Sequence, residues 1–170
     1  MIKQDILENQ VKSIYLGIGS NLGNRKNNIE KAKFELIKNG INILESSRYY
    51  ESLSWPDQKK PKFLNIVLKV NSKLTIIKLL KICKKIEIYL GRKKSKKNSP
   101  RKCDIDILDF RNEILNGEII VPHPRMHVRN FVLFPLFEIN KDWIHPASKC
   151  HIKKLILLLS NSDIRSIKQI

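Results

Sequence analysis

The order of hydrophobic patterns along the chain is the feature that most constrains its fold. Two segments show helical spacing and four are strand-like: helices at 28–38 and 74–89, strands at 14–18, 41–51, 63–70 and 103–110. Only a proline-containing loop separates the second strand from the third, which indicates antiparallel pairing. The order β-α-β-β-α-β predicts an α+β fold, a ferredoxin-like (split β-α-β) antiparallel sheet with helices packed on one face. A hairpin turn, a short helix at 131–139 and a final helix at 151–159 are expected to follow.

Three glycines follow the first predicted strand, in the stretch YLGIGSNLGNR. Gly17, Gly19 and Gly23 are placed as in a dinucleotide-binding unit, where glycines let the backbone approach a phosphate. Such a unit also needs an acidic residue about 20 positions later, and Glu45 lies near there. A strand-to-helix turn requires glycine even without a ligand, because its backbone adopts positive φ. Since the two antiparallel strands that follow form no βαβ crossover, the dinucleotide interpretation weakens.

At 170 residues the chain is long enough for one domain with a buried core, and too short for a dinucleotide-binding domain plus a separate catalytic domain. We expect a single domain over residues 14–170, preceded by an N-terminal extension, residues 1–13. The extension lacks an apolar signal core and no stretch reaches the length of a membrane span, so we expect a cytoplasmic protein. Cys83, Cys103 and Cys150 form no CxxC pair, which argues against a disulfide framework or structural zinc.

Basic residues outnumber acidic ones by 33 to 16, which gives a net charge of +17. This charge predicts attraction to polyanions without identifying which one. Nucleic acid, nucleotide phosphates and an anionic membrane all remain open, as does a surface that simply carries solvated lysines.

Asp104 and Asp106 form the strongest local signal. Side chains two residues apart on a strand point to the same face, so both carboxylates lie side by side while Ile105 and Ile107 face the core. Neighbouring carboxylates repel each other, and Mg²⁺ relieves that repulsion while binding water and substrate phosphate oxygens. The alternative is a strand with one solvated face.

Seven lysines and arginines in the segment RKKSKKNSPRK lead the chain into this acidic pair. Carboxylates that hold a metal, next to cations, form the arrangement that phosphoryl transfer requires. Arg92 and Arg101 are the main candidates, because a guanidinium binds two phosphate oxygens at once. Further along, His123 and Arg129 are candidates for phosphate contacts, since the prolines beside His123 disfavour a zinc-binding helix.

Several sequence blocks occur in a fixed order: GSNLGNR, FLN, E-x-x-x-GR, SPRKCDIDILDF, VPHPRM and R-x-F-V-L-x-P-L-x-E. Together they resemble the hydroxymethyldihydropterin pyrophosphokinase family of folate biosynthesis. The resemblance runs from Ile14 to Pro146, and the pair of blocks SPRKCDIDILDF and VPHPRM is its most specific part. It implies a ferredoxin-like fold, in agreement with the order of elements above.

The resemblance implies transfer of the terminal diphosphate of ATP to the 6-hydroxymethyl group of the reduced pterin, with release of AMP. It implies that Asp104 and Asp106 hold two Mg²⁺ ions and that Arg92, Arg101 and Asp106 are catalytic. The implied ATP contacts are Glu87, Arg92, Lys94, Arg101, His123 and Arg129. The implied pterin contacts are Gly19, Ser20, Ser52, Trp55, Phe63, Asn65 and Phe131.

Three positions depart from the family pattern. Asn98 replaces a common tryptophan, Lys94 a common arginine, and Glu118 a basic residue of some members. Diphosphate transfer must exclude water, so loops 53–62 and 92–101 are expected to close over both substrates.

Two alternatives from other classes remain. An RNA-binding module would need aromatic residues on the sheet surface, and the strands YLGIGS and FLNIVL lack that pattern. A different Mg²⁺-dependent nucleotidyl or phosphoryl transferase would suit the D-x-D pair equally well. We expect the partners to be ATP and the reduced pterin, with no nucleic acid and no membrane, and the chain to be a monomer.

Overall fold

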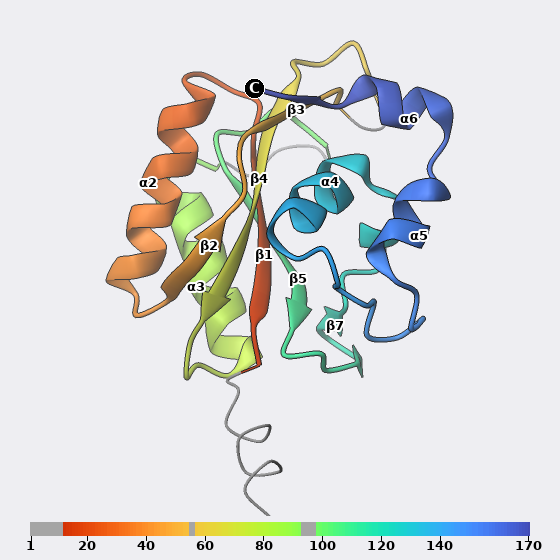
Figure 1. The fold of residues 1–170 in the computed structure, drawn as a ribbon. Coiled ribbons are helices and arrows are strands. Elements are labelled where there is room, and N and C mark those ends of the chain that lie inside the picture. The colour runs from red at the N-terminus through yellow and green to blue at the C-terminus, as the bar shows by residue number, and fades with distance from the viewer. Residues whose placement is uncertain (1–11, 55–56, 93–97) are drawn as a thin grey trace, which may run out of the picture.

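A computed structural model describes residues 12–54, 57–92 and 98–170. Its centre is an antiparallel sheet in the order β5-β1-β4-β3-β8, with β2 also paired to β4. Figure 1 shows helices on both sides of this sheet. The strands are β1 (Ile14–Ser20), β2 (Asn42–Ser46), β3 (Tyr50–Ser52), β4 (Phe63–Asn71), β5 (Asp104–Phe110), β6 (Leu115–Asn116), β7 (Ile120–Val121) and β8 (Lys168–Gln169). The helices are α2 (Arg25–Lys38), α3 (Ile76–Tyr89), the 3₁₀ turn Met126–Val128, α4 (Asn130–Ile139), α5 (Ile152–Leu157) and α6 (Asn161–Ser166).

Two hydrophobic cores lie on opposite faces of the sheet. Ile14, Leu16 and Ile18 of β1 pack with α2 and α3, as the split β-α-β prediction requires. Tyr15 and Val67 belong to a second core with α4 and α5. The α+β, ferredoxin-like prediction is confirmed, and the predicted helix layer on one face is joined by a layer on the other face. The physical reason is that β4 is buried on both faces, so its second face also needs a cover.

The predicted strand at 41–51 is divided into β2 and β3. Ser47 lies at the break, where its backbone N–H donates to Val67 O at 2.9 Å and its Oγ accepts from Val67 N, also at 2.9 Å. A side-chain hydroxyl therefore replaces a carbonyl in the ladder and bends the strand. The bend lets β3 pair with the first residues of β4, so that Ser52 lies opposite Phe63.

Local capping explains where the two long helices begin and end. Asn24 caps α2 by accepting from Asn27 N, so the helix begins three residues before the predicted start. Gly40, at φ 77°, follows the end of α2, and Gly91, at φ 96°, follows the end of α3. The turn at Gly91 directs the chain toward the loop that precedes β5. No helix in residues 12–54, 57–92 or 98–170 combines the length and apolarity needed to cross a bilayer.

Candidate active site

Two glycines form the floor of the candidate site. In the pairing of β1 with β5, Gly17 lies opposite Asp106 and Gly19 opposite Asp104. Both aspartates are partly exposed, while Ile105 between them is fully buried in the α2–α3 core. The two carboxylates therefore leave the same face of β5, as their two-residue spacing predicts.

A cavity of about 980 Å³ opens over this face. Twelve of the predicted site residues line it: Gly19, Ser52, Phe63, Asn65, Glu87, Arg92, Arg101, Asp104, Asp106, His123, Arg129 and Phe131. β1, β3, β4, β5, α3 and α4 all contribute, although these elements are far apart in sequence. The fold thus gathers most of the predicted set at one place.

Three predicted site residues are not among the described residues that line the cavity. Ser20 is fully buried, and its Oγ accepts from Asn28 Nδ2 at 3.1 Å. Its hydroxyl therefore supports the turn between β1 and α2 rather than facing the cavity. Trp55 and Lys94 lie outside the described residues.

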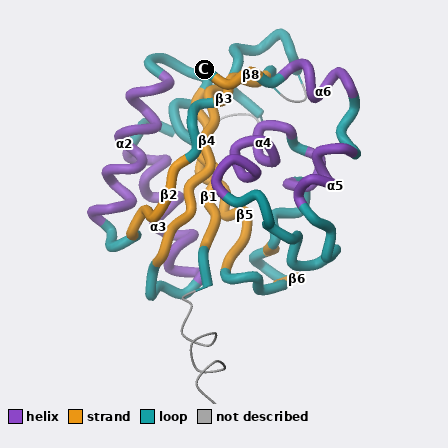
Figure 2. The backbone as a smooth tube through the Cα atoms, viewed as in Figure 1, coloured by secondary structure: helices purple, strands orange, loops and turns teal. Residues whose placement is uncertain are grey.

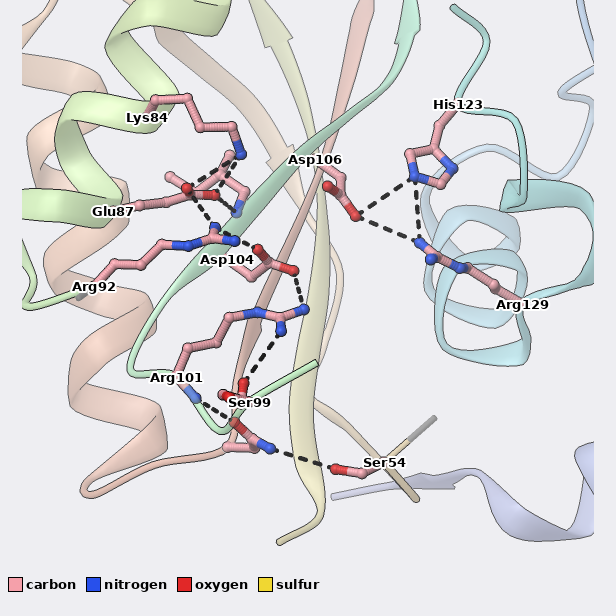
Figure 3. A network of polar contacts seen from close by, with 12 residues as sticks. Ser54, Lys84, Glu87, Arg92, Ser99, Arg101, Asp104, Asp106, His123 and Arg129 are labelled. Carbon is pink, nitrogen blue, oxygen red and sulfur yellow. Dashed lines mark hydrogen bonds and ion pairs between the residues drawn. The ribbon is translucent and has the colours of Figure 1, made fainter. Parts of the chain in front are cut away.

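Asp104 is held by two arginines (Figure 3). Arg92 Nη1 donates to its Oδ1 at 2.8 Å, and Arg101 Nη2 donates to its Oδ2 at 2.6 Å. Burial works against the charge on Arg92, but the carboxylates of Glu87 and Asp104 outweigh it, so the pKa of Arg92 is raised. Both guanidinium groups are thus fixed and charged next to the carboxylate pair.

Glu87 anchors this network from α3, with only 1% of its side chain exposed. Its carboxylate accepts from Arg92 Nη1, from Lys84 Nζ at 3.0 Å and from Ile105 N at 2.8 Å. These donors engage both oxygens, so Glu87 orients Arg92 and the start of β5. Sequence reasoning missed Lys84, which lines the cavity and lies one helical turn before Glu87.

Asp106 has more open surroundings than Asp104. Its Oδ2 lies 3.4 Å from Arg129 Nη1 and 3.8 Å from His123 Nε2, and 34% of its side chain is exposed. Burial, helped by Arg129 and Arg125, lowers the pKa of His123 although Asp106 opposes the shift. Burial also lowers the pKa of Arg129. Because its contacts are long and its side chain is partly exposed, Asp106 retains room for a further ligand.

An aromatic slot adjoins the charged groups. The Arg101 guanidinium lies 5.3 Å from the ring centre of Phe63, and that of Arg129 lies 5.4 Å from Phe131. Asn65 Nδ2 donates to Ser52 Oγ at 3.0 Å and to Tyr50 O at 3.3 Å. The Oδ1 atom of this amide would lie 3.1 Å from a Cβ at position 19, so any other residue there would require the Asn65 amide to shift.

Sequence reasoning also missed Asn21, which is 3% exposed. Its Nδ2 donates to Pro61 O at 3.1 Å and to Ser54 Oγ at 3.3 Å. Its Oδ1 accepts from Arg101 N at 2.8 Å, and its own N–H donates to Arg101 O at 3.1 Å. One amide therefore ties the turn after β1 to parts of both predicted closing loops.

Comparison with known proteins agrees with this geometry. Residues 15–141 match the family model described as 7,8-dihydro-6-hydroxymethylpterin-pyrophosphokinase (HPPK). The chain belongs to the HPPK family. A protein of Aquifex aeolicus named 2-amino-4-hydroxy-6-hydroxymethyldihydropteridine pyrophosphokinase is 39% identical over 143 residues, covering 84% of this chain and 89% of that protein. The Haemophilus influenzae protein of the same name is 34% identical over 137 residues, or 79% and 86% of the two chains.

Longer proteins contain a similar segment. Folic acid synthesis protein fol1 of Pneumocystis carinii is 37% identical over 157 residues, which cover 92% of this chain but only 21% of that protein. A crystal structure of Plasmodium falciparum HPPK-DHPS with pteroate aligns at a TM-score of 0.69 and 13% identity, covering 84% of this chain and 41% of that one. This HPPK-family chain is thus a pyrophosphokinase of folate synthesis, as the sequence blocks implied. Membership of the HPPK family, rather than the net charge, decides against the RNA-binding module and the different Mg²⁺-dependent transferase.

The donor set also fits magnesium. In residues 12–54, 57–92 and 98–170, no three or more His, Cys, Asp or Glu side chains are grouped to hold a metal ion. Two carboxylates on one strand face, next to a cavity large enough for phosphate oxygens and water, are what Mg²⁺ uses when a substrate completes its coordination.

Proposed function

We propose that this cavity is where the HPPK-family chain transfers the terminal diphosphate of ATP to 6-hydroxymethyl-7,8-dihydropterin. The pterin hydroxyl oxygen attacks the β-phosphorus, and the bond from that phosphorus to the α–β bridging oxygen breaks. AMP leaves with the bridging oxygen, and the hydroxyl proton passes to Asp106 or to water. One observation carries the proposal: the acidic pair, six lysine and arginine side chains and an aromatic slot line one cavity.

Asp104 and Asp106 would hold Mg²⁺, and the family resemblance implies two ions. When bound, the metal neutralises phosphate charge and leaves the β-phosphorus open to attack. Arg92 and Arg101 supply fixed charge for the phosphates on one side, and Arg129 supplies charge on the other, where His123 offers a ring nitrogen for a hydrogen bond. Glu87 acts by orienting Arg92.

The pterin ring would lie between Phe63 and Phe131. Offset stacking contributes about 0.5–1.5 kcal/mol per aromatic pair beyond burial. Asn65, oriented by Ser52, would bond the edge of the ring above the floor formed by Gly19. Contacts from Ser20, Trp55 and Lys94 stay predictions.

The chain is proposed to work alone, as a cytoplasmic monomer. In support, the charged groups and the aromatic slot all come from one chain. Sedimentation at micromolar concentration would check this by giving a mass near 19.9 kDa.

Product analysis tests the reaction. The purified chain, incubated with Mg²⁺, ATP and the hydroxymethyl pterin, is expected to form AMP and the pterin diphosphate in equal amounts, as resolved by anion-exchange chromatography. EDTA should stop both products. Formation of ADP, or AMP release that does not depend on the pterin, would contradict the proposed transfer.

A further inference from the structure

The C-terminal segment contacts two walls of the aromatic slot. Residues 161–170 lie beyond both the family match and the elements that the sequence predicted. They form α6 and β8, and Figure 2 shows this segment passing from α5 above α4 to the edge of the sheet at β3. We call residues 161–170 the C-terminal strap.

The first wall that the strap contacts is β3. Gln169 lies opposite Tyr50 and Lys168 opposite Glu51, and Ile170 N donates to Tyr49 O at 3.0 Å. The Tyr50 hydroxyl also donates to Gln169 Oε1 at 3.3 Å. Without β8 this three-residue strand would be an unpaired edge, the least constrained position in a sheet. Strand β3 carries Ser52, the hydroxyl that orients Asn65.

The second wall is the start of α4. Asn130, its first residue, is 8% exposed, and its Nδ2 donates to Asp163 O at 2.6 Å and to Ser166 Oγ at 3.0 Å. Its Oδ1 accepts from Phe131 N at 2.6 Å. One amide therefore connects α6 to the backbone of the residue whose ring lines the slot.

We propose that the C-terminal strap is a positioning element that sets the separation between the Ser52–Asn65 wall and the Phe131 wall. Among the described residues, its hydrogen bonds to other elements go to β3, to the adjacent Tyr49 and to the start of α4, and none goes to β5 or to the arginines on Asp104. The strap therefore controls affinity for the flat ring more than affinity for ATP. This inference rests on the proposed placement of the pterin.

Two variants of the full enzyme test the strap. Deletion of residues 167–170 removes β8, while Asn130→Asp keeps the acceptor for Phe131 N but removes the donor to α6. Each is expected to raise the KM for the pterin about tenfold, the scale of one or two lost hydrogen bonds. The KM for ATP of the deletion variant should stay within about twofold, because the residues proposed to bind phosphate, Arg92, Arg101, His123 and Arg129, lie outside β3 and β8. Lys168→Ala and Arg165→Ala, exposed positions in the same strap, are matched controls.

Steady-state assays would be run well below the unfolding midpoint, and pterin fluorescence would measure ring binding directly. Unchanged pterin affinity in both variants overturns the inference, and so does an equal rise of both KM values, which indicates a general loss of structure. If the deletion variant does not fold, Asn130→Asp decides. Failure of the wild-type chain to use the pterin would instead contradict the proposed function.

Discussion

Asp104 and Asp106 stand two residues apart but have different surroundings. Both oxygens of Asp104 accept from arginines at 2.6–2.8 Å, whereas Asp106 has only longer contacts and is twice as exposed, at 34% against 17%. Asp106 is therefore the more open of the two carboxylates. If both hold metal as proposed, Asp104 would bind it fully only after its arginines move toward phosphate.

Replacing Asp106 by asparagine should remove turnover while preserving the fold. We expect kcat to fall by a factor on the order of 10² to 10³, as when one charge-stabilising group is lost from a dry site. AMP release would be measured against Mg²⁺ concentration, with thermal unfolding as the check on folding. Asp142→Asn, whose side chain is 93% exposed, is the matched control. Near-normal AMP production by Asp106→Asn would rule out its metal role.

The three thiols should react at very different rates. Burial raises the pKa of Cys83 and of Cys103 to about 12, whereas Cys150 is only half-buried. At pH 8 only about 10⁻⁴ of each buried thiol is ionised, and the thiolate is the reactive form. A chromogenic disulfide reagent should modify Cys150 first and the other two only on unfolding. Cys150→Ser should abolish the fast phase, and a persistent fast phase would show that a buried thiol is accessible.

For single residues, the two-residue spacing of Asp104 and Asp106 was enough to predict that both side chains leave the same face of the strand, because strand geometry fixes that face. The hydrogen-bond partners of the Glu87 carboxylate were not predictable from the sequence. Its carboxylate bonds Ile105 N, a contact between α3 and β5 that depends on how the helix packs on the sheet. Asn21 gave no chemical signal because its bonds go mainly to backbone groups of distant loops.

At the level of elements, the turn after β1 connects the two predicted closing loops. Asn21 bonds Pro61 of one loop and Arg101 of the other, and Lys60 Nζ donates to Asn98 O at 2.9 Å between the same two loops. Movement of either loop is therefore coupled to the other.

Replacement of Asn21 by alanine should uncouple the two predicted closing loops. Loss of a buried amide with several partners costs about 1–3 kcal/mol, and we expect KM to rise for both substrates together with the ratio of ATP hydrolysis to transfer. Ser54→Ala, which removes the 3.3 Å bond from Asn21 and the 2.6 Å bond from Ser54 Oγ to Pro61 O but leaves the Asn21 bonds to Arg101 and Pro61, is the graded comparison. If the ratio of ATP hydrolysis to transfer is the same in Asn21→Ala as in wild type, the two loops are not coupled through Asn21.

Elements with a strong periodic pattern could be predicted, and those held by partners could not. The helices at α2 and α3 carry their own apolar stripe and caps. Segment α6–β8 has no such stripe, and its strand exists because β3 offers an edge. The break at Ser47 arises from a side chain that bonds the neighbouring strand, which no local pattern reveals.

On the scale of the whole molecule, β5 contributes side chains to both hydrophobic cores, and its Asp109 is fully buried. Its carboxylate accepts from Trp143 Nε1 and Asn112 N, both at 2.9 Å. Burial therefore raises its pKa above the ordinary 3.8 despite these hydrogen bonds. The folded protein binds this proton more tightly than the unfolded chain does.

Asp109 should make stability fall as pH rises. Its contribution is fully present below the unfolded pKa and is lost as pH rises through the raised folded value. Urea unfolding from about pH 3.5 to 7 should show the free energy of unfolding of wild type decreasing relative to Asp109→Asn. Glu51→Gln is the opposite control, because bonds from Arg25 and Lys62 lower the pKa of Glu51. If the difference in the free energy of unfolding between wild type and Asp109→Asn does not change with pH, Asp109 has no such effect on stability.

If the pterin lies against Gly19 as proposed, this bare floor limits how the enzyme could evolve resistance to drugs that mimic the ring. The Cβ of any other residue there would lie 3.1 Å from Asn65 and 3.2 Å from Phe63, so these two proposed substrate contacts would have to shift. An inhibitor flat against this backbone would meet a surface that a substitution at position 19 changes only by disturbing the proposed substrate contacts as well.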